Sequence, residues 1–167
     1  ASPLAPTKSC APPPSVSPTG LTLLYIYGGA WHFLDKDMGT RRFFRHLSAQ
    51  GHTVMDISYT HAPQAKLEDM VREVKQAILW MKTTGSQRYG VDSERIVLCG
   101  CSSGAQMALL AAYTPDHPAY QPAAPACSTR VRAVVSYCGI PDMRTSYWRF
   151  HDQLGSIFRS DRPIGRW

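Results

Sequence analysis

The alternation of apolar and amphipathic segments constrains the fold of this chain more than any other feature. Four short segments consist mostly of apolar and β-branched residues, as buried strands do. They lie at 21–27, 53–59, 95–99 and 131–137. Helical patterns separate them over about 38–49, 67–81 and 105–113, and Gly85 is the predicted C-terminal cap of the second. Because strands joined through helices run parallel, the sequence predicts an α/β fold: a mostly parallel, doubly wound sheet with helices on both faces.

The 167 residues fit a single domain preceded by a short lead-in. Residues 1–20 hold six prolines and few large apolar side chains, which predicts an extended or disordered lead-in. The domain is then expected over 21–167. A hydrophobic content of 44% and a charged content of 18% are typical of a globular protein. No apolar run approaches the roughly 20 residues that cross a bilayer, so no membrane span is expected.

Charge and cysteine usage exclude several classes of protein. The net charge is +6, but basic residues are scattered among acids over the first two thirds, so we expect no nucleic-acid partner. Five cysteines without a Cys-x-x-Cys pair argue against a disulfide framework or a zinc site. A reducing compartment, the cytoplasm, is therefore favoured. Cys99 and Cys138 fall in or beside predicted strands and are expected to be small buried hydrophobes.

A glycine-flanked serine lies between the third predicted strand and the helix after it. Gly100-Cys101-Ser102-Ser103-Gly104 is a Gly-x-Ser-x-Gly sequence in the strand-to-helix context of a nucleophile elbow. A side chain at either glycine would collide with the neighbouring strand and helix. The alternative is a glycine-rich turn of a nucleotide-binding fold, but the chain has neither a Gly-x-Gly-x-x-Gly motif nor a P-loop lysine to support it.

A second glycine motif, Tyr27-Gly28-Gly29-Ala30-Trp31, follows the first predicted strand. With both motifs in this order, the sequence resembles the α/β-hydrolase superfamily, specifically carboxylesterases of the hormone-sensitive-lipase and feruloyl-esterase-like type. That group carries His-Gly-Gly-Gly-Trp and then Gly-x-Ser-x-Gly-Gly. The resemblance covers residues 21 to about 145 and includes Tyr59–Pro63 and Tyr89–Ile96. This chain departs from the pattern at Tyr27, Ala30 and Ala105.

The resemblance implies a role for each matching residue. Ser102 is the expected nucleophile, and the backbone N–H groups of Gly29, Ala30 and Ser103 are the expected oxyanion hole. Gly28 and Trp31 are expected at the pocket, although Trp31 suits the core equally well. The implied reaction is hydrolysis of a small carboxylic ester through an acyl-serine intermediate, with no cofactor and no metal.

The acid and the base are the open part of this prediction. In this fold they follow later strands, in the order serine, acid, histidine. Asp142 and His151 satisfy that order here, and their alternative roles are a turn or helix cap and a surface histidine. We therefore expect a C-terminally incomplete portion of an esterase. The alternative is a short non-catalytic hydrolase-like protein that binds a ligand or partner. An uncovered apolar sheet edge, with possible self-association through it, favours the first.

Overall fold

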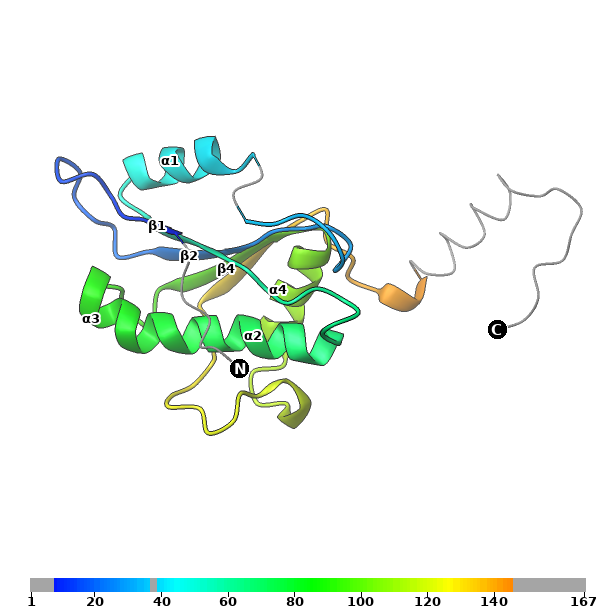
Figure 1. Ribbon diagram of the computed structural model, residues 1–167. Coiled ribbons are helices and arrows are strands. Elements are labelled where there is room, and N and C mark those ends of the chain that lie inside the picture. The colour runs from blue at the N-terminus through cyan, green and yellow to red at the C-terminus, as the bar shows by residue number, and fades with distance from the viewer. Residues whose placement is uncertain (1–7, 37–38, 146–167) are drawn as a thin grey trace, which may run out of the picture.

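Five strands form one sheet in the computed structural model, which describes residues 8–36 and 39–145 (Figure 1). The strands are β1 (Lys8–Cys10), β2 (Thr22–Ile26), β3 (Thr53–Ile57), β4 (Ile96–Cys101) and β5 (Ala133–Tyr137). Their order across the sheet is β1-β3-β2-β4-β5, in which the last four are parallel and β1 is antiparallel to β3. The predicted, mostly parallel α/β sheet is therefore confirmed.

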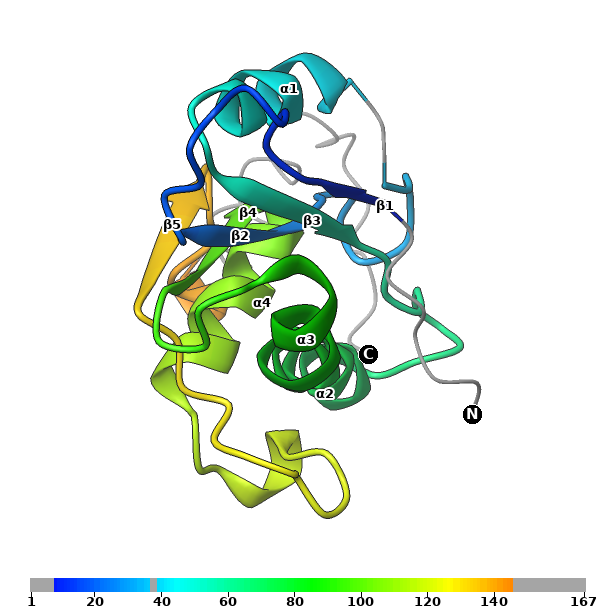
Figure 2. The same cartoon turned by 90° about the vertical axis from the view of Figure 1, so that its left-hand side faces the viewer.

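Helices cover both faces of this sheet (Figures 1 and 2). Helix α1 (Arg41–Ala49) lies on one face, and α2 (Leu67–Trp80), α3 (Ser86–Tyr89) and α4 (Ser103–Tyr113) lie on the other. A short 3-10 helix, η2 (Pro118–Tyr120), follows α4. Every residue of β2 and β3 is buried, because each strand has neighbours on both edges and helices on both faces.

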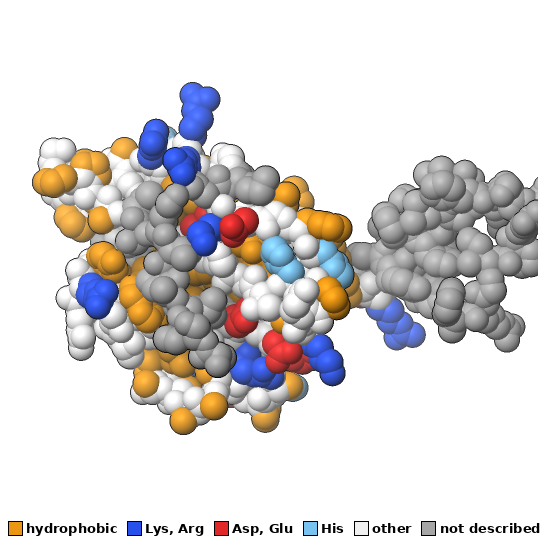
Figure 3. All heavy atoms as spheres, viewed as in Figure 1, with side chains coloured by type: hydrophobic (Ala, Val, Ile, Leu, Met, Phe, Trp, Pro, Cys, Tyr) orange, Lys and Arg blue, Asp and Glu red, His pale blue; other side chains and the backbone are white. Residues whose placement is uncertain are grey.

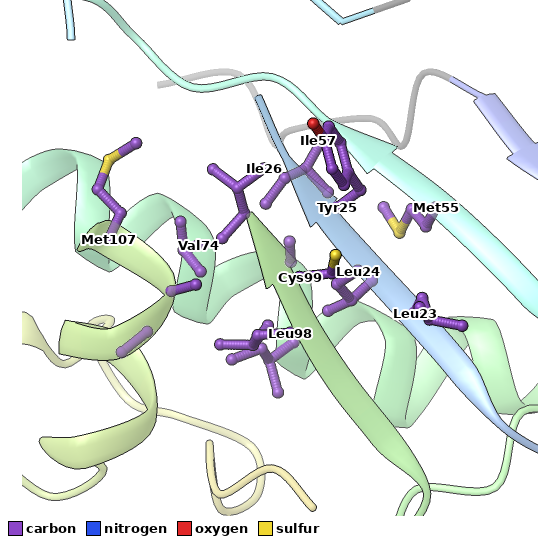
Figure 4. Packing of buried hydrophobic residues seen from close by; sticks show 14 of the residues in the cluster. Leu23, Leu24, Tyr25, Ile26, Met55, Ile57, Val74, Leu98, Cys99 and Met107 are labelled. Carbon is purple, nitrogen blue, oxygen red and sulfur yellow. The ribbon is translucent and has the colours of Figure 1, made fainter. Parts of the chain in front are cut away.

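The core lies between the central strands and the helices (Figure 4). Leu24, Ile26 and Leu98 have no exposed surface, and Val74 of α2 and Met107 of α4 are equally inaccessible. On the other face, Tyr25 packs edge-on against Phe44 of α1 with ring centroids 5.2 Å apart. Two-sided burial explains why the strands appear in the sequence as continuous apolar runs.

The second helical region is longer than predicted. After α2 the chain continues through a π-helical turn, η1 (Met81–Gly85), directly into α3. Gly85 is therefore not a C-terminal cap. It is buried, and a Cβ at that position would meet the sulfur of Met81 at 2.6 Å. The cap is Gly90, whose φ of 64° is the left-handed conformation that glycine adopts at helix ends.

Part of the expected lead-in is ordered. Within residues 1–20, β1 pairs along the outer edge of β3, with Ser9 opposite Met55. Backbone pairing satisfies groups that an edge strand leaves open, and it needs no apolar side chains. Further on, the Thr19 N–H donates to the Gly51 carbonyl and Arg95 donates to the Thr19 carbonyl. This part of the segment is therefore an anchored extension of the sheet.

A buried lysine anchors the C-terminal end of α4. Lys75 of α2 has no exposed surface, and its Nζ donates to the carbonyl of Thr114 at 2.5 Å and to that of Pro115 at 3.3 Å. A cation at a helix C-terminus also complements the helix dipole. Loss of hydration lowers the pKa of Lys75. The helix that begins beside Ser102 is thus held at its far end.

The described residues bear on three expectations from composition: membrane spans, surface charge and buried cysteines. No helix within residues 8–36 and 39–145 is long and apolar enough to cross a membrane. On the face in Figure 3, several basic side chains gather at the top over α1, and others adjoin acidic side chains. Cys99 is buried as expected, and burial raises the pKa of its thiol to about 11. Cys138 is exposed instead, because it follows the outer strand β5.

Candidate active site

Ser102 occupies a sharp turn between β4 and α4. Its φ of 52° and ψ of −119° are rare for a residue with a side chain. Such a conformation costs on the order of 1–3 kcal/mol, so the surroundings must hold it. The Ser102 N–H donates to the carbonyl of Tyr137 at 2.8 Å, and the Ser102 carbonyl accepts from Gln106 at 3.0 Å. Strand β5 and the first turn of α4 therefore fix the serine backbone.

The glycines on either side of Ser102 allow the close packing that this turn requires. A Cβ at Gly100 would lie 2.5 Å from the carbonyl carbon of Gly104. A Cβ at Gly104 would overlap the carbonyl oxygens of Ile26 and Tyr27 at the end of β2. Both obstacles are backbone atoms, which cannot rotate away. This steric restriction is the one that the Gly-x-Ser-x-Gly sequence predicts.

The residues after β2 form a tight turn beside Ser102, here called the glycine loop (residues 28–33). Gly28 is buried, and a Cβ there would lie 2.9 Å from the Cys101 carbonyl oxygen and 3.2 Å from the Ser102 Cβ. The Gly29 carbonyl accepts hydrogen bonds from the N–H groups of His32 and Phe33 at 3.0 and 2.9 Å. The structure thus brings the two predicted motifs together at the carboxyl ends of β2 and β4, where open α/β sheets bind ligands.

Ala30 takes a glycine-like conformation in this loop. Its φ is 50°, and that of Trp31 is 64°, so two consecutive residues with side chains lie in the left-handed region. Each such residue costs about 1–2 kcal/mol relative to the right-handed conformation. The backbone course is therefore one that a third glycine would adopt more easily. Ala30 is exposed, so its methyl group meets no steric obstacle from the core.

Trp31 lies both against the core and at the wall of a cavity, the two places between which the sequence leaves it open. It is half-buried and packs against the core cluster. It also lines a cavity of about 260 Å³ together with residues from the segment after β3, from α2 and from the chain after β5. These residues are Ala62, Ala65, Lys66, Leu67, Met70 and Met143. The cavity is almost entirely apolar, apart from the exposed Lys66.

Sequence reasoning did not identify His61, which contacts Tyr27. The Tyr27 hydroxyl lies 2.9 Å from Nε2 of His61, and its ring stacks on Tyr59. Burial raises the pKa of Tyr27 above its usual value, as it does that of Tyr59. The two residues of the hydrogen bond are 34 positions apart, so no local pattern in the sequence could have predicted it.

Ser103 is the first residue of α4 and has no exposed surface. The N–H groups in the first turn of a helix have no acceptor within the helix, so they are free to donate to a ligand. The positive end of the helix dipole favours a negative charge at the same place. This arrangement puts a backbone donor on the residue next to Ser102.

Asp142 begins a helical turn after β5. Its carboxylate accepts hydrogen bonds from the N–H groups of Arg144 and Thr145 and from the Thr145 hydroxyl. The hydrogen bonds from Thr145 lower the pKa of Asp142. This is the geometry of a helix N-cap on an exposed residue. His151 lies outside the described residues, so the pairing of Asp142 with His151 stays a prediction. No group of metal-ligating side chains occurs in the described parts of the chain.

Several known proteins are similar in sequence to this chain. A probable carboxylic ester hydrolase of Mycobacterium tuberculosis, LipM, is 36% identical over 124 residues, which cover 74% of this chain and 28% of LipM. Esterase LipC of the same organism is 33% identical over 161 residues, covering 86% of this chain and 40% of LipC. Kynurenine formamidase of Danio rerio is 28% identical and covers 79% and 41%. This chain thus spans less than half the length of each of these relatives.

Solved structures share the fold. Esterase 2 of Thermogutta terrifontis with bound propionate superimposes with a TM-score of 0.67 at 21% identity, covering 89% of this chain and 55% of the esterase. The same esterase phosphonylated by cyclosarin gives a TM-score of 0.65, covering 79% of this chain and 50% of the esterase. A family model described as BD-FAE matches residues 11–157, which include the glycine loop, the elbow and all four parallel strands. This chain is therefore an α/β-hydrolase and belongs to the BD-FAE family.

Proposed function

We propose that Ser102 is the nucleophile of a serine hydrolase that cleaves small carboxylic esters. The strained turn at Ser102, held by Tyr137 and by α4, is the observation that carries this proposal. A strand-to-helix turn of this shape presents the serine side chain at the top of the sheet. The esterases among the relatives support the same reaction class and do not favour a non-catalytic binding protein.

In the proposed mechanism, a general base removes the proton from the Ser102 hydroxyl while Oγ attacks the ester carbonyl carbon. The resulting oxyanion accepts hydrogen bonds from the N–H groups of Gly29, Ala30 and Ser103. The bond to the alcohol oxygen then breaks, and the alcohol leaves with the proton. Water repeats these steps on the acyl-serine and releases the acid. The proposed reaction uses no metal and no cofactor.

The cavity beside Trp31 is the proposed site for an apolar part of the substrate. Its volume of about 260 Å³ suits a small acyl or alcohol group, and its walls offer few polar partners. Asp142 and His151 are the proposed acid and base of this chain. Their order after Ser102 supports this assignment. The Asp142 carboxylate itself caps its own helical turn.

Covalent labelling tests the role of Ser102. We expect a fluorophosphonate probe to label the wild-type chain at Ser102 and to leave Ser102→Ala unlabelled. Ser93→Ala is the matched control, because Ser93 lies in the loop before β4 and its hydroxyl contacts only Glu94 among the described hydrogen bonds. Equal labelling of Ser102→Ala and of the wild type would contradict the proposed nucleophile.

We also propose self-association through β5 and a reducing, cytoplasmic location. Val135 and Tyr137 of β5 are 38% and 47% exposed, and no described strand pairs with the outer edge of β5. An open apolar edge of this kind favours pairing with another chain. Sedimentation of the wild type and of Val135→Lys tests the association.

The proposed location rests on the cysteines. Those whose side chains are described are all free, which supports a reducing compartment, and cell fractionation tests it.

A further inference from the structure

Tyr27 joins the strand that ends beside Ser102 to the segment after β3. Its hydroxyl oxygen lies 2.9 Å from Nε2 of His61. Its ring stacks on Tyr59, with centroids 4.6 Å apart and planes inclined by 21°. Tyr27 and Tyr59 are both 5% exposed and His61 is half-buried, so the tyrosine side of the contact is shielded from water. In such surroundings a hydrogen bond has few competing partners and holds its geometry well.

Three further hydrogen bonds connect the glycine loop to residues 59–62. The Ala62 N–H donates to the Trp31 carbonyl at 3.0 Å, and Nδ1 of His32 lies 3.1 Å from the Ala62 carbonyl oxygen. The Tyr59 hydroxyl donates to the Gly28 carbonyl at 3.4 Å. The Tyr27–His61 contact is the one among these four that joins two side chains. The glycine loop is therefore held from outside as well as by its own turn.

The position of this loop matters because of its distance from Ser102. Gly28 is the residue after Tyr27, and a Cβ on it would lie 3.2 Å from the Ser102 Cβ. A shift of the Tyr27 backbone therefore moves the following N–H groups relative to the serine. Oxyanion donors act at about 2.7–3.1 Å, and a misplacement of about 1 Å can slow a reaction about 100-fold.

We propose that Tyr27 and His61 form a positioning pair that holds the Gly29 and Ala30 N–H groups beside Ser102, where they can reach the oxyanion. This inference rests on the proposed function of Ser102 and deepens it. Neither side chain has to touch the substrate. The pair acts through the backbone of the glycine loop, and its effect should appear in the reaction rate rather than in ester binding.

Two readouts on the full chain test the pair. The first is hydrogen exchange of the Ala62 and Phe33 amides, which reports the contacts of the loop without requiring activity. The second is the rate of fluorophosphonate labelling. The variants are Tyr27→Phe, His61→Leu and their combination, with His61→Gln as the variant that keeps a hydrogen-bonding group. Tyr25→Phe is the matched control, because it removes a hydroxyl from a buried tyrosine of β2, two residues before Tyr27.

We expect Tyr27→Phe and His61→Leu each to accelerate exchange at Ala62 and to slow labelling about 10- to 100-fold. The double variant should label no more slowly than either single variant, because both substitutions remove the same hydrogen bond. His61→Gln should stay closer to the wild-type rate than His61→Leu, and Tyr25→Phe should change neither readout. If Tyr27→Phe does not fold, the half-buried His61 provides the same test.

Unchanged exchange in both single variants would overturn the pair. Faster exchange with wild-type labelling would overturn its positioning role, and so would losses that multiply in the double variant. Persistent labelling of Ser102→Ala has a different meaning, because it overturns the proposed nucleophile. Labelling that is lost in Ser102→Ala but normal in Tyr27→Phe overturns the positioning pair alone.

Discussion

Strands β4 and β5 are neighbours in one parallel sheet and carry similar apolar residues, yet their burial differs. Ile96 and Leu98 of β4 have no exposed surface, whereas Val135 and Tyr137 of β5 are 38% and 47% exposed. Strand β4 lies between β2 and β5, and β5 is the outermost described strand. Burial thus depends on the place of a strand in the sheet, and an apolar pattern alone does not determine it.

The same difference extends to the chemistry at the ends of the two strands. The chain leaving β4 turns at Ser102 under backbone constraints from β2, β5 and α4. The chain leaving β5 reaches Asp142, which is exposed and contacts mainly its own turn. The turn that carries Ser102, the proposed nucleophile, is therefore held by the core, and Asp142, the proposed acid, is not.

Replacement of Gly104 and of Gly139 by alanine should give the largest difference in stability between the end of β4 and the end of β5. In Gly104→Ala the new Cβ meets carbonyl oxygens of Ile26 and Tyr27, which belong to the backbone of the central strand and its end. We expect a loss of about 4 kcal/mol or more in the free energy of unfolding, measured by urea denaturation. Gly139→Ala meets the Ser136 hydroxyl, which can rotate, and the Ala105 Cβ at 3.1 Å. That variant should lose less than about 1 kcal/mol.

Removing two methyl groups from a valine in each strand is the next largest test. Val97 of β4 is 8% exposed, against 38% for Val135 of β5. We expect Val97→Ala to lower the free energy of unfolding by about 2 kcal/mol, and Val135→Ala by about 1 kcal/mol or less. Equal losses in urea denaturation would contradict the difference in burial, and would place β5 in a covered environment in solution.

The sequence predicts the parts of the fold that depend on continuous patterns. The strand at β2 and the helix at α2 are recognisable because their residues pack on the core over their whole length. The elbow at Ser102 is recognisable for a steric reason, since only glycine fits at Gly100 and Gly104. In both cases the physical constraint acts on consecutive or closely spaced residues, so it leaves a local signal.

The contacts that the sequence does not reveal lack such a signal. Strand β1 pairs through its backbone, so its residues need no strand-like side chains. The partner of Tyr27 is 34 positions away, and histidine at position 61 has no pattern that assigns it to a tyrosine. Cys138 follows an apolar strand but is exposed, because the strand is at the edge of the sheet.

Alkaline pH tests how strongly the buried side of the sheet protects Tyr25. Burial raises the pKa of Tyr25 in β2 to about 12 from the ordinary 10.0. The folded chain therefore keeps this proton between pH 10 and 12, where the unfolded chain releases it. The contribution is fully present below pH 10 and is lost as the pH rises through about 12. Across this range the wild type should lose up to about 2 kcal/mol relative to Tyr25→Phe in urea denaturation.

The smallest effect is expected at Asp142. Loss of an N-cap side chain costs about 1 kcal/mol, but the turn after Asp142 is exposed. Asp142→Ala should therefore open this turn locally, with faster hydrogen exchange at Arg144 and Thr145, and should leave the global free energy of unfolding nearly unchanged. Asp142→Asn is the control, because the amide oxygen can still accept the hydrogen bonds of the turn.

Acid should have the same local effect as Asp142→Ala. Hydrogen bonds from Thr145 lower the pKa of Asp142, so the charged cap is fully present above the ordinary pKa of 3.8 and is lost as the pH falls through the lowered value. A global loss as large as that of Val97→Ala would contradict this view. It would mean that the chain after β5 is packed as firmly as the elbow, and that Asp142 is held in place by more than its own turn.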